Sequence, residues 1–173
     1  KRVDRAIYLL QELVTRSSLV DWRLVVIGDG EKRQALQNLA TQLDVEERVV
    51  FLGRVSHSDG IRVMSSCDCL LSVNDGSNLG NPVLEAQRLG KVVFSLDDGS
   101  TDGVLTNGKN AILVPITGFP ANMADEMNSF ATDETFRRRM EDGAEANGRE
   151  CILPWEERMK VEVETVRDIS LNK

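Results

Sequence analysis

The sequence has 173 residues, of which 41% are hydrophobic and 28% charged, as expected of a single globular domain with its own core. It contains no apolar run near the roughly 20 residues that a membrane-spanning helix needs, and nothing in it resembles a signal peptide. The net charge of -7 argues against a nucleic-acid partner, because phosphate binding normally needs a basic face.

Strand-like runs alternate with helical segments along most of the chain. The runs are short, β-branched and almost fully apolar, which is typical of parallel strands covered by helices on both faces. They lie at 23–27, 49–52, 69–73, 92–96 and 111–114. Apolar residues at helical spacing fill the intervals, beginning with Val3, Ile7, Leu10 and Val14. This alternation predicts a Rossmann-like α/β fold, a doubly wound parallel sheet with right-handed crossovers.

The two ends of the chain differ from the middle. After Pro115 the pattern is helical, and we predict helices over 120–131, 133–148 and 154–170, the second one capped by Thr132 or Asp133. At the other end a helix begins at residue 1 with no strand ahead of it. A doubly wound unit usually opens with a strand, so we expect residues 1–173 to be one domain that lacks its first strand and is excised from a larger protein.

The cysteines and the single histidine give weak signals. Cys67 and Cys69 fit no zinc-binding spacing and a second cysteine pair is missing, so we predict no metal site and reduced, buried thiols. That thiol state favours a cytoplasmic protein. His57 lies in no triad-like pattern, and we expect it to be a loop or cap residue before a helix over 59–66.

The loop between the third and fourth strands carries the strongest local signal. Pro82 suits the first position of a helix, so Asn81 is the expected N-cap, and the free amides around 78–81 would form an anion site. Glu85 lies one turn further on. Two interpretations remain open for Glu85: a carboxylate that grips the vicinal hydroxyls of a ribose, or a helix-dipole partner on a solvated face.

Several segments, in this order and spacing, resemble one known family. They are "KRVDRAIYLL", "WRLVVIGDGEKRQAL", "RVVFLGRVSHSDGI", "CDCLLSVND", "GNPVLEAQRLGKVVFSLDDGS", "NGKNAILVP" and "PWEERM". Together they resemble the C-terminal, donor-binding domain of GT-B type glycosyltransferases, in particular the retaining group that uses nucleotide-diphospho-sugars. The segment 154–170 then resembles the helix that crosses back onto the N-terminal domain of that family.

The resemblance implies roles for specific residues. Lys1 would neutralise the diphosphate, and Glu85 would hold the ribose hydroxyls. The family usually carries an acid where this chain has Ser77, and another where it has Gly103, so the resemblance is incomplete at both positions. The remaining residues implied to bind the donor are Gly30, Gly53, Arg54, Val55, Ser77, Asn78, Leu79 and Gly80.

The resulting hypothesis is the donor-binding half of an enzyme that moves a sugar from a UDP- or GDP-sugar to a hydroxyl acceptor with retention. It would use no cofactor and no metal, and its partners would be the donor and a missing N-terminal domain. That missing half would provide any membrane contact, at the inner face of the membrane. Two alternatives are a non-catalytic nucleotide-sugar-binding scaffold and a sugar-nucleotide epimerase. A nicotinamide-binding domain is disfavoured, because Gly28-Asp29-Gly30 lacks the third glycine of that fingerprint.

Overall fold

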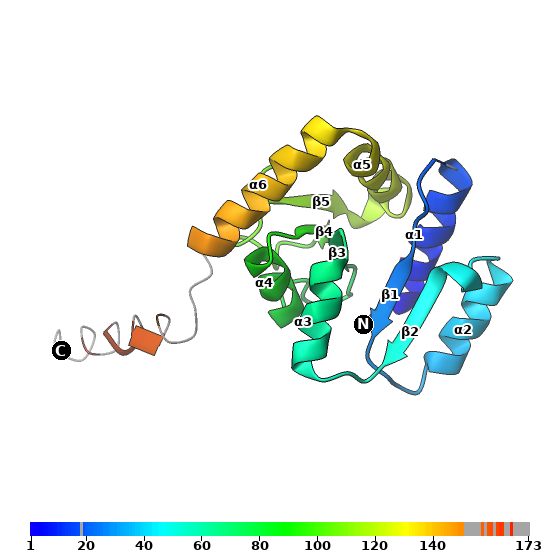
Figure 1. Cartoon of the computed structure of the whole chain (residues 1–173), viewed down its shortest axis with the longest axis horizontal. Helices are drawn as coiled ribbons and strands as arrows, with labels where there is room; N and C mark the ends of the chain where they lie inside the picture. Colours follow the sequence, from blue (N-terminus) through cyan, green and yellow to red (C-terminus); the bar gives the residue numbers. More distant parts are fainter. Residues whose placement is uncertain (18, 151–156, 158, 161, 165–166, 168–173) are drawn as a thin grey trace.

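The chain folds into parallel β-strands flanked by α-helices, as shown in a computed structural model that describes residues 1–17, 19–150, 157, 159–160, 162–164 and 167 (Figure 1). The strands are β1 (Leu24–Ile27), β2 (Val49–Gly53), β3 (Cys69–Ser72), β4 (Val92–Asp97) and β5 (Ala111–Pro115). The helices are α1 (Val3–Arg16), α2 (Arg33–Gln42), α3 (His57–Ser66), α4 (Asn81–Arg88), α5 (Ala121–Thr132) and α6 (Glu134–Glu150). The α/β fold class and the five strands predicted from the sequence are confirmed.

The strands are all paired in parallel, but they form two sheets instead of one. β1 pairs with β2, and β3, β4 and β5 pair in that order. The single doubly wound sheet expected from the sequence is therefore interrupted between β1 and β3. The strands themselves form where predicted because Val, Ile, Leu and Phe suit a pleated surface covered on both faces.

The core is centred on β4, whose first five residues are all buried. Successive residues of a strand point to opposite faces. On one face Phe94 packs edge-on against Phe130 of α5, with ring centroids 5.5 Å apart, and Met140 of α6 joins the same cluster. On the other face Val93 packs with Val83 of α4. The helices thus cover both faces of the β3–β5 sheet.

Helix α6 approaches its neighbours so closely that two of its residues are glycine. A Cβ atom added to Gly148 would lie 2.0 Å from the carbonyl oxygen of Gln87, and one added to Gly143 would lie 1.8 Å from that of Lys109. α6 begins after Asp133, whose Oδ1 accepts the N–H of Phe136 at 3.0 Å. The capping role predicted for Asp133 is confirmed.

The predictions for the cysteines and for the C-terminal segment have different outcomes. Cys67 and Cys69 are free and half-buried, and burial raises the pKa of the Cys69 thiol to about 12, in agreement with an inert thiol. The helix predicted over 154–170 falls mainly outside the described residues. No helix among the residues that the structure describes is long and apolar enough to cross a bilayer.

Candidate functional site

The loops after β1 and β2 meet at the carboxyl edge of their sheet. The N–H of Gly28 donates to the carbonyl of Gly53 at 2.8 Å, and both residues have positive φ, at 117° and 73°. Such backbone conformations favour glycine, because a Cβ would be strained there. Gly30 is exposed in the first loop, while Arg54 is exposed and Val55 half-buried in the second. The predicted residues Gly30, Gly53, Arg54 and Val55 therefore lie in two adjoining loops, and Gly53 is buried where the loops meet.

The loop after β3 is held together from inside by Asn78. This side chain is 1% exposed, and its Oδ1 accepts the N–H of Asn74 at 2.8 Å and the hydroxyl of Ser72 at 3.1 Å. Its amide nitrogen Nδ2 donates to Asp98 at 2.8 Å. The backbone N–H of Asn78 donates to Ser100 Oγ at 2.7 Å. Asn78 thus joins the loop after β3 to the loop after β4, and its own N–H is already used.

Asp98 is the charged member of this group. Its Oδ1 accepts both the N–H of Ser100 at 2.9 Å and the Ser100 hydroxyl at 2.5 Å. Partial desolvation acts to raise the pKa of Asp98, but the hydrogen bonds from Ser100 and Asn78 together outweigh it, and the pKa is lowered. The ionised carboxylate therefore fixes the relative positions of these two loops.

A second attachment joins the outer part of the same loop to α1. Asp75 lies 3.0 Å from Arg2 and 2.7 Å from Arg5, and Arg5 also donates to the carbonyl of Val73 at 3.0 Å. The hydrogen bond from Arg2 is the main cause of a lowered pKa at Asp75, followed by the nearby charges of both arginines against a desolvation effect of opposite sign. Because Asp75 already pairs with two cations, it is not available to replace the acid absent at position 77.

Helix α4 begins directly after this loop, and its N-terminal cap differs from the prediction. Gly80 is the N-cap and Asn81 the first helical residue, so the expectation that Asn81 caps the helix is wrong. No side chain caps the helix, because the N-cap residue Gly80 has no side-chain oxygen to accept an amide N–H. Within the part of the chain that the structure describes, the N–H groups of Gly80 and Asn81 have no partner. They form, with the helix dipole, an anion-binding surface.

Ser77 and Leu79 complete the loop's outer surface. Ser77 Oγ lies 3.2 Å from both the N–H and the carbonyl oxygen of Leu79, a tight local turn. Ser77 is exposed and Leu79 half-buried. Lys1 is also exposed, and it lines the same cavity as Ser77 and Gly80. These three residues therefore line one elongated cavity that also borders β1 and β3.

Glu85 is half-buried, with its side chain 29% exposed, and it points toward the start of α3. Its Oε1 lies 2.9 Å from His57 Nε2. An ionised carboxylate can only accept, so this contact needs the proton on Nε2. The second carboxylate oxygen remains available to a ligand. Glu85 thus lies near the carboxyl edge of the strands. It is half-buried and paired with His57, which does not fit the interpretation that it only offsets the helix dipole on a solvated face.

His57 is the residue at this site that sequence reasoning missed. It is the first residue of α3, preceded by the cap Ser56, whose Oγ accepts the N–H of Asp59 at 3.1 Å. The expectation that His57 is a loop or cap residue is wrong, because the helix begins at His57 itself and Ser56 is the cap. No local pattern indicates the contact with Glu85, 28 residues away. The position of His57 soon after the end of β2 did indicate that it lies near the carboxyl edge of the strands, where the loops converge.

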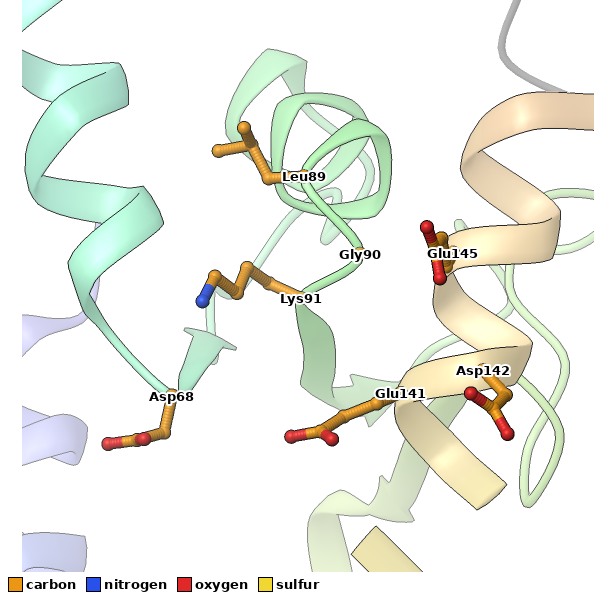
Figure 2. A pocket seen from close by; sticks show the side chains of 7 residues that line it. All are labelled: Asp68, Leu89, Gly90, Lys91, Glu141, Asp142 and Glu145. Atoms are coloured by element: carbon orange, nitrogen blue, oxygen red, sulfur yellow. The ribbon is translucent and has the colours of Figure 1, made fainter. Parts of the chain in front are cut away.

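A second cavity lies at the opposite, amino end of β3 and β4 (Figure 2). It measures about 300 Å³, and Lys91 faces it together with Asp68, Glu141, Asp142 and Glu145. In Figure 2 the carboxylates project in different directions and do not converge on one point. Among the described residues, no group of three His, Cys, Asp or Glu side chains could hold a metal ion.

Residues 1–147 match the family model described as Glycosyl transferases group 1. The chain is 28% identical over 140 residues to N-acetyl-alpha-D-glucosaminyl L-malate synthase of Bacillus anthracis, covering 81% of this chain and 35% of the relative. It is 30% identical over 117 residues to the lipopolysaccharide core biosynthesis glycosyltransferase LpsE of Rhizobium meliloti, covering 68% of this chain and 34% of the relative. The chain spans about a third of the length of these curated relatives.

Solved structures show the same fold. Anabaena HepE in complex with UDP-glucose superposes with a TM-score of 0.70 at 23% identity, over 84% of this chain and 40% of that one. Sucrose-phosphate synthase from Thermosynechococcus elongatus superposes with a TM-score of 0.78 at 18% identity, over 98% of this chain and 43% of that one. These likenesses confirm the predicted GT-B type of α/β fold.

Proposed function

The chain belongs to the family of group 1 glycosyl transferases, and we propose that it is the nucleotide-sugar-binding half of such an enzyme. The intact protein would move a sugar from a UDP- or GDP-sugar to a hydroxyl acceptor with retention of configuration. The donor would lie along the carboxyl edge of the strands, between the loops that carry Gly30, Gly53 and Ser77.

The observation that carries this proposal is the position of Glu85. Its half-buried carboxylate lies in α4, about one turn after the free amides of Gly80 and Asn81, near the edge where ligands bind in open parallel sheets. A carboxylate can accept two hydrogen bonds from vicinal hydroxyls, and helix amides favour an anion. A nucleoside diphosphate presents both groups, a ribose diol and a pyrophosphate, within one molecule.

The residues then have distinct roles in the proposed reaction. Negative charge grows on the leaving diphosphate as the glycosidic bond breaks, and the Lys1 ammonium with the loop amides would stabilise it. Arg54, Val55 and the Gly53 turn would border the base, and Leu79 and Gly80 would approach the sugar and diphosphate. Asn78, whose N–H is used by Ser100, would act by holding the loop in shape. No cofactor is proposed, because the nucleotide-diphospho-sugar is itself the activated substrate.

The proposal includes partners and a location. The acceptor would bind a further, N-terminal domain, so residues 1–173 alone would not turn over. The relatives include a lipopolysaccharide core glycosyltransferase, and we propose polysaccharide or glycolipid assembly in the cytoplasm, with any contact to the inner face of the membrane through the further domain.

A second candidate is a nucleotide-sugar-binding domain without catalytic activity. Two observations favour it: Ser77 stands where the family usually has an acid, and the nearest carboxylate, Asp75, is paired with Arg2 and Arg5. An epimerase is a weaker alternative, since it would need several acid–base groups and the chain has one histidine.

A thermal-shift panel tests the proposal directly. UDP, GDP, UDP-glucose and NAD would be added to the wild-type chain and to Glu85→Gln, with Glu134→Gln at the exposed start of α6 as the matched control. A nucleotide at 100 times its Kd adds about 2.7 kcal/mol of stability. We expect UDP or GDP to raise the Tm of wild type and Glu134→Gln by clearly more than that of Glu85→Gln. A rise with NAD alone, or an equal rise in Glu85→Gln, would contradict the proposal.

Catalysis is tested separately in the full-length protein. Wild type and Ser77→Asp would be assayed for hydrolysis of several nucleotide-sugars. Turnover by wild type that is lost in Glu85→Gln would exclude the non-catalytic candidate. Binding without turnover in wild type, together with activity gained by Ser77→Asp, would favour it.

A further inference from the structure

His57 and Glu85 belong to two helices that lie side by side, α3 and α4 (Figure 1). Nε2 of His57 and Oε1 of Glu85 are 2.9 Å apart, a hydrogen bond between positions 28 residues apart in the sequence. Among the residues that the structure describes, this imidazole is the only hydrogen-bond partner of the Glu85 carboxylate. The orientation in which the carboxylate meets a ligand therefore depends on His57.

The start of α3 determines where the imidazole lies. Ser56 caps the helix, and its Oγ accepts the N–H of Asp59 at 3.1 Å, so the backbone of His57 is held in a fixed first turn. The carboxylate of this first turn, Asp59, is already bonded to the hydroxyl of Ser56 at 2.5 Å and to Arg62. The imidazole consequently bonds to Glu85 of the neighbouring helix and not to an acid of its own helix.

The hydrogen bond leaves the carboxylate with one engaged and one open oxygen. An ionised carboxylate only accepts hydrogen bonds, so Nε2 of His57 is the donor. The bond takes one acceptor position of Glu85 Oε1, and Oε2 has no partner within the described part of the chain. A ribose presents two neighbouring hydroxyls, and a carboxylate that is held through one oxygen meets them in a single orientation.

Holding the carboxylate in advance matters because a glutamate side chain is flexible. Ordering such a side chain at a binding site weakens binding about two- to tenfold. The bond from His57 supplies this order before a ligand arrives. The imidazole itself is 78% exposed, so replacing it removes little packing from the core.

We propose that His57 is a positioning residue for the recognition of ribose. It presents the Glu85 carboxylate to the ribose hydroxyls, and it thereby raises the selectivity of the site for ribonucleotides over 2′-deoxyribonucleotides. This inference rests on the proposed function, in which Glu85 binds the ribose. Because His57 acts through Glu85, it does not contribute to recognition of the base or of the diphosphate.

The affinities for UDP and 2′-deoxy-UDP separate a positioning role from a merely structural one. Isothermal titration calorimetry would give the ratio of the two Kd values for wild type, His57→Gln and His57→Asn. The amide nitrogen of glutamine can take the place of Nε2 and donate to Glu85. The shorter asparagine side chain places its amide near the position of Nδ1 and does not reach the carboxylate.

We expect UDP to bind wild type about tenfold or more tightly than 2′-deoxy-UDP, because a hydrogen bond to a charged group is lost with the hydroxyl. His57→Gln should keep this ratio. In His57→Asn the ratio should fall about threefold, through weaker binding of UDP and not of 2′-deoxy-UDP. Ser66→Ala, at the exposed end of the same helix, is the control and should keep the wild-type ratio.

Three outcomes would overturn the inference. They are a wild-type ratio in His57→Asn, an equal loss of affinity for both nucleotides in that variant, and a His57→Gln variant that behaves like His57→Asn. The Tm of each variant without nucleotide shows whether it folds. If His57→Asn does not fold, His57→Phe replaces it, since phenylalanine keeps a ring but has no donor, and the same outcomes apply.

Failure of the proposed function has a different signature. Wild type would then bind neither nucleotide, or both equally, or Glu85→Gln would keep the wild-type ratio. Glu85 would in that case not hold the ribose, and the inference about His57 would fall with it. If Glu85→Gln loses the ratio while His57→Asn keeps it, only the inference about His57 is wrong.

Discussion

His57 Nε2 and Glu85 Oε1 lie 2.9 Å apart, and their contact joins the start of α3 to the first turns of α4. The His57 side chain is 78% exposed, whereas that of Glu85 is 29% exposed. His57 therefore faces solvent, whereas Glu85 is the more buried partner and the one proposed to bind the ligand.

The first prediction separates these two roles. We expect Glu85→Gln to weaken UDP binding about tenfold or more, because a hydrogen bond to a charged group contributes about 1.5–3 kcal/mol. His57→Ala should weaken binding less than Glu85→Gln, since it removes only a partner that orients the carboxylate. Isothermal titration calorimetry with UDP measures both. An equal loss in His57→Ala would show that His57 itself contacts the nucleotide.

Asn78 should contribute more to the stability of the fold than its neighbour Ser77. Asn78→Ala leaves the N–H of Asn74, the hydroxyl of Ser72 and one oxygen of Asp98 without this partner. Each buried polar group left unsatisfied costs about 1–3 kcal/mol, and we expect a loss of at least that size in urea denaturation. Ser77→Ala is the control, because Ser77 is exposed and bonds only to Leu79. Similar losses in both variants would contradict a structural role for Asn78.

Much of the fold could be predicted because its signals are local. Continuous apolar runs identified β4 and β5, and a proline beside a polar loop located the start of α4 within one residue. Glu85 could be assigned to the carboxyl edge for the same reason, since the end of β3, the loop and the helix start follow one another directly.

The remaining features depend on contacts between distant segments. The pair of His57 with Glu85 spans 28 residues, and the attachment of Asp75 to Arg2 spans 73. The interruption of the sheet between β1 and β3 also depends on how distant strands pair, because each strand alone has the sequence of a fully buried one. No local pattern distinguishes an open strand edge from a paired one.

The glycines of α6 give a prediction about packing. Alanine normally favours a helix over glycine by about 1 kcal/mol. At Gly148, however, a Cβ would lie 2.0 Å from the backbone oxygen of Gln87, so the helix must move away. We expect Gly148→Ala to lower the free energy of unfolding by about 1–3 kcal/mol, the usual cost of overpacking. The urea midpoint measures it.

Gly76→Ala is the matched control for that substitution. A Cβ at Gly76 would meet nothing within 4 Å, and its φ is not in the left-handed region. Its urea midpoint should stay near that of wild type. A stabilised Gly148→Ala variant would mean that α6 does not pack as closely as described.

The last prediction concerns acid and the pairing of Asp75 with Arg2 and Arg5. The folded-state pKa of Asp75 is lowered from its ordinary value of 3.8, mainly by the hydrogen bond from Arg2. A depressed carboxyl pKa contributes stability that is present above the unfolded pKa and is lost as pH falls through the folded pKa. The free energy of unfolding should therefore be larger for wild type than for Asp75→Asn at pH 7. This difference should disappear below about pH 4, because the Asp75 carboxylate becomes protonated and no longer pairs with the arginines. The difference should also shrink in 1 M NaCl, which screens an exposed ion pair.

Urea denaturation between pH 3 and pH 7 measures the difference in stability, and the same comparison in an Arg2→Gln/Arg5→Gln background is the control. If the acid-dependent difference persists in that background, it arises from some other group, and the loop is not attached to α1 through these charges.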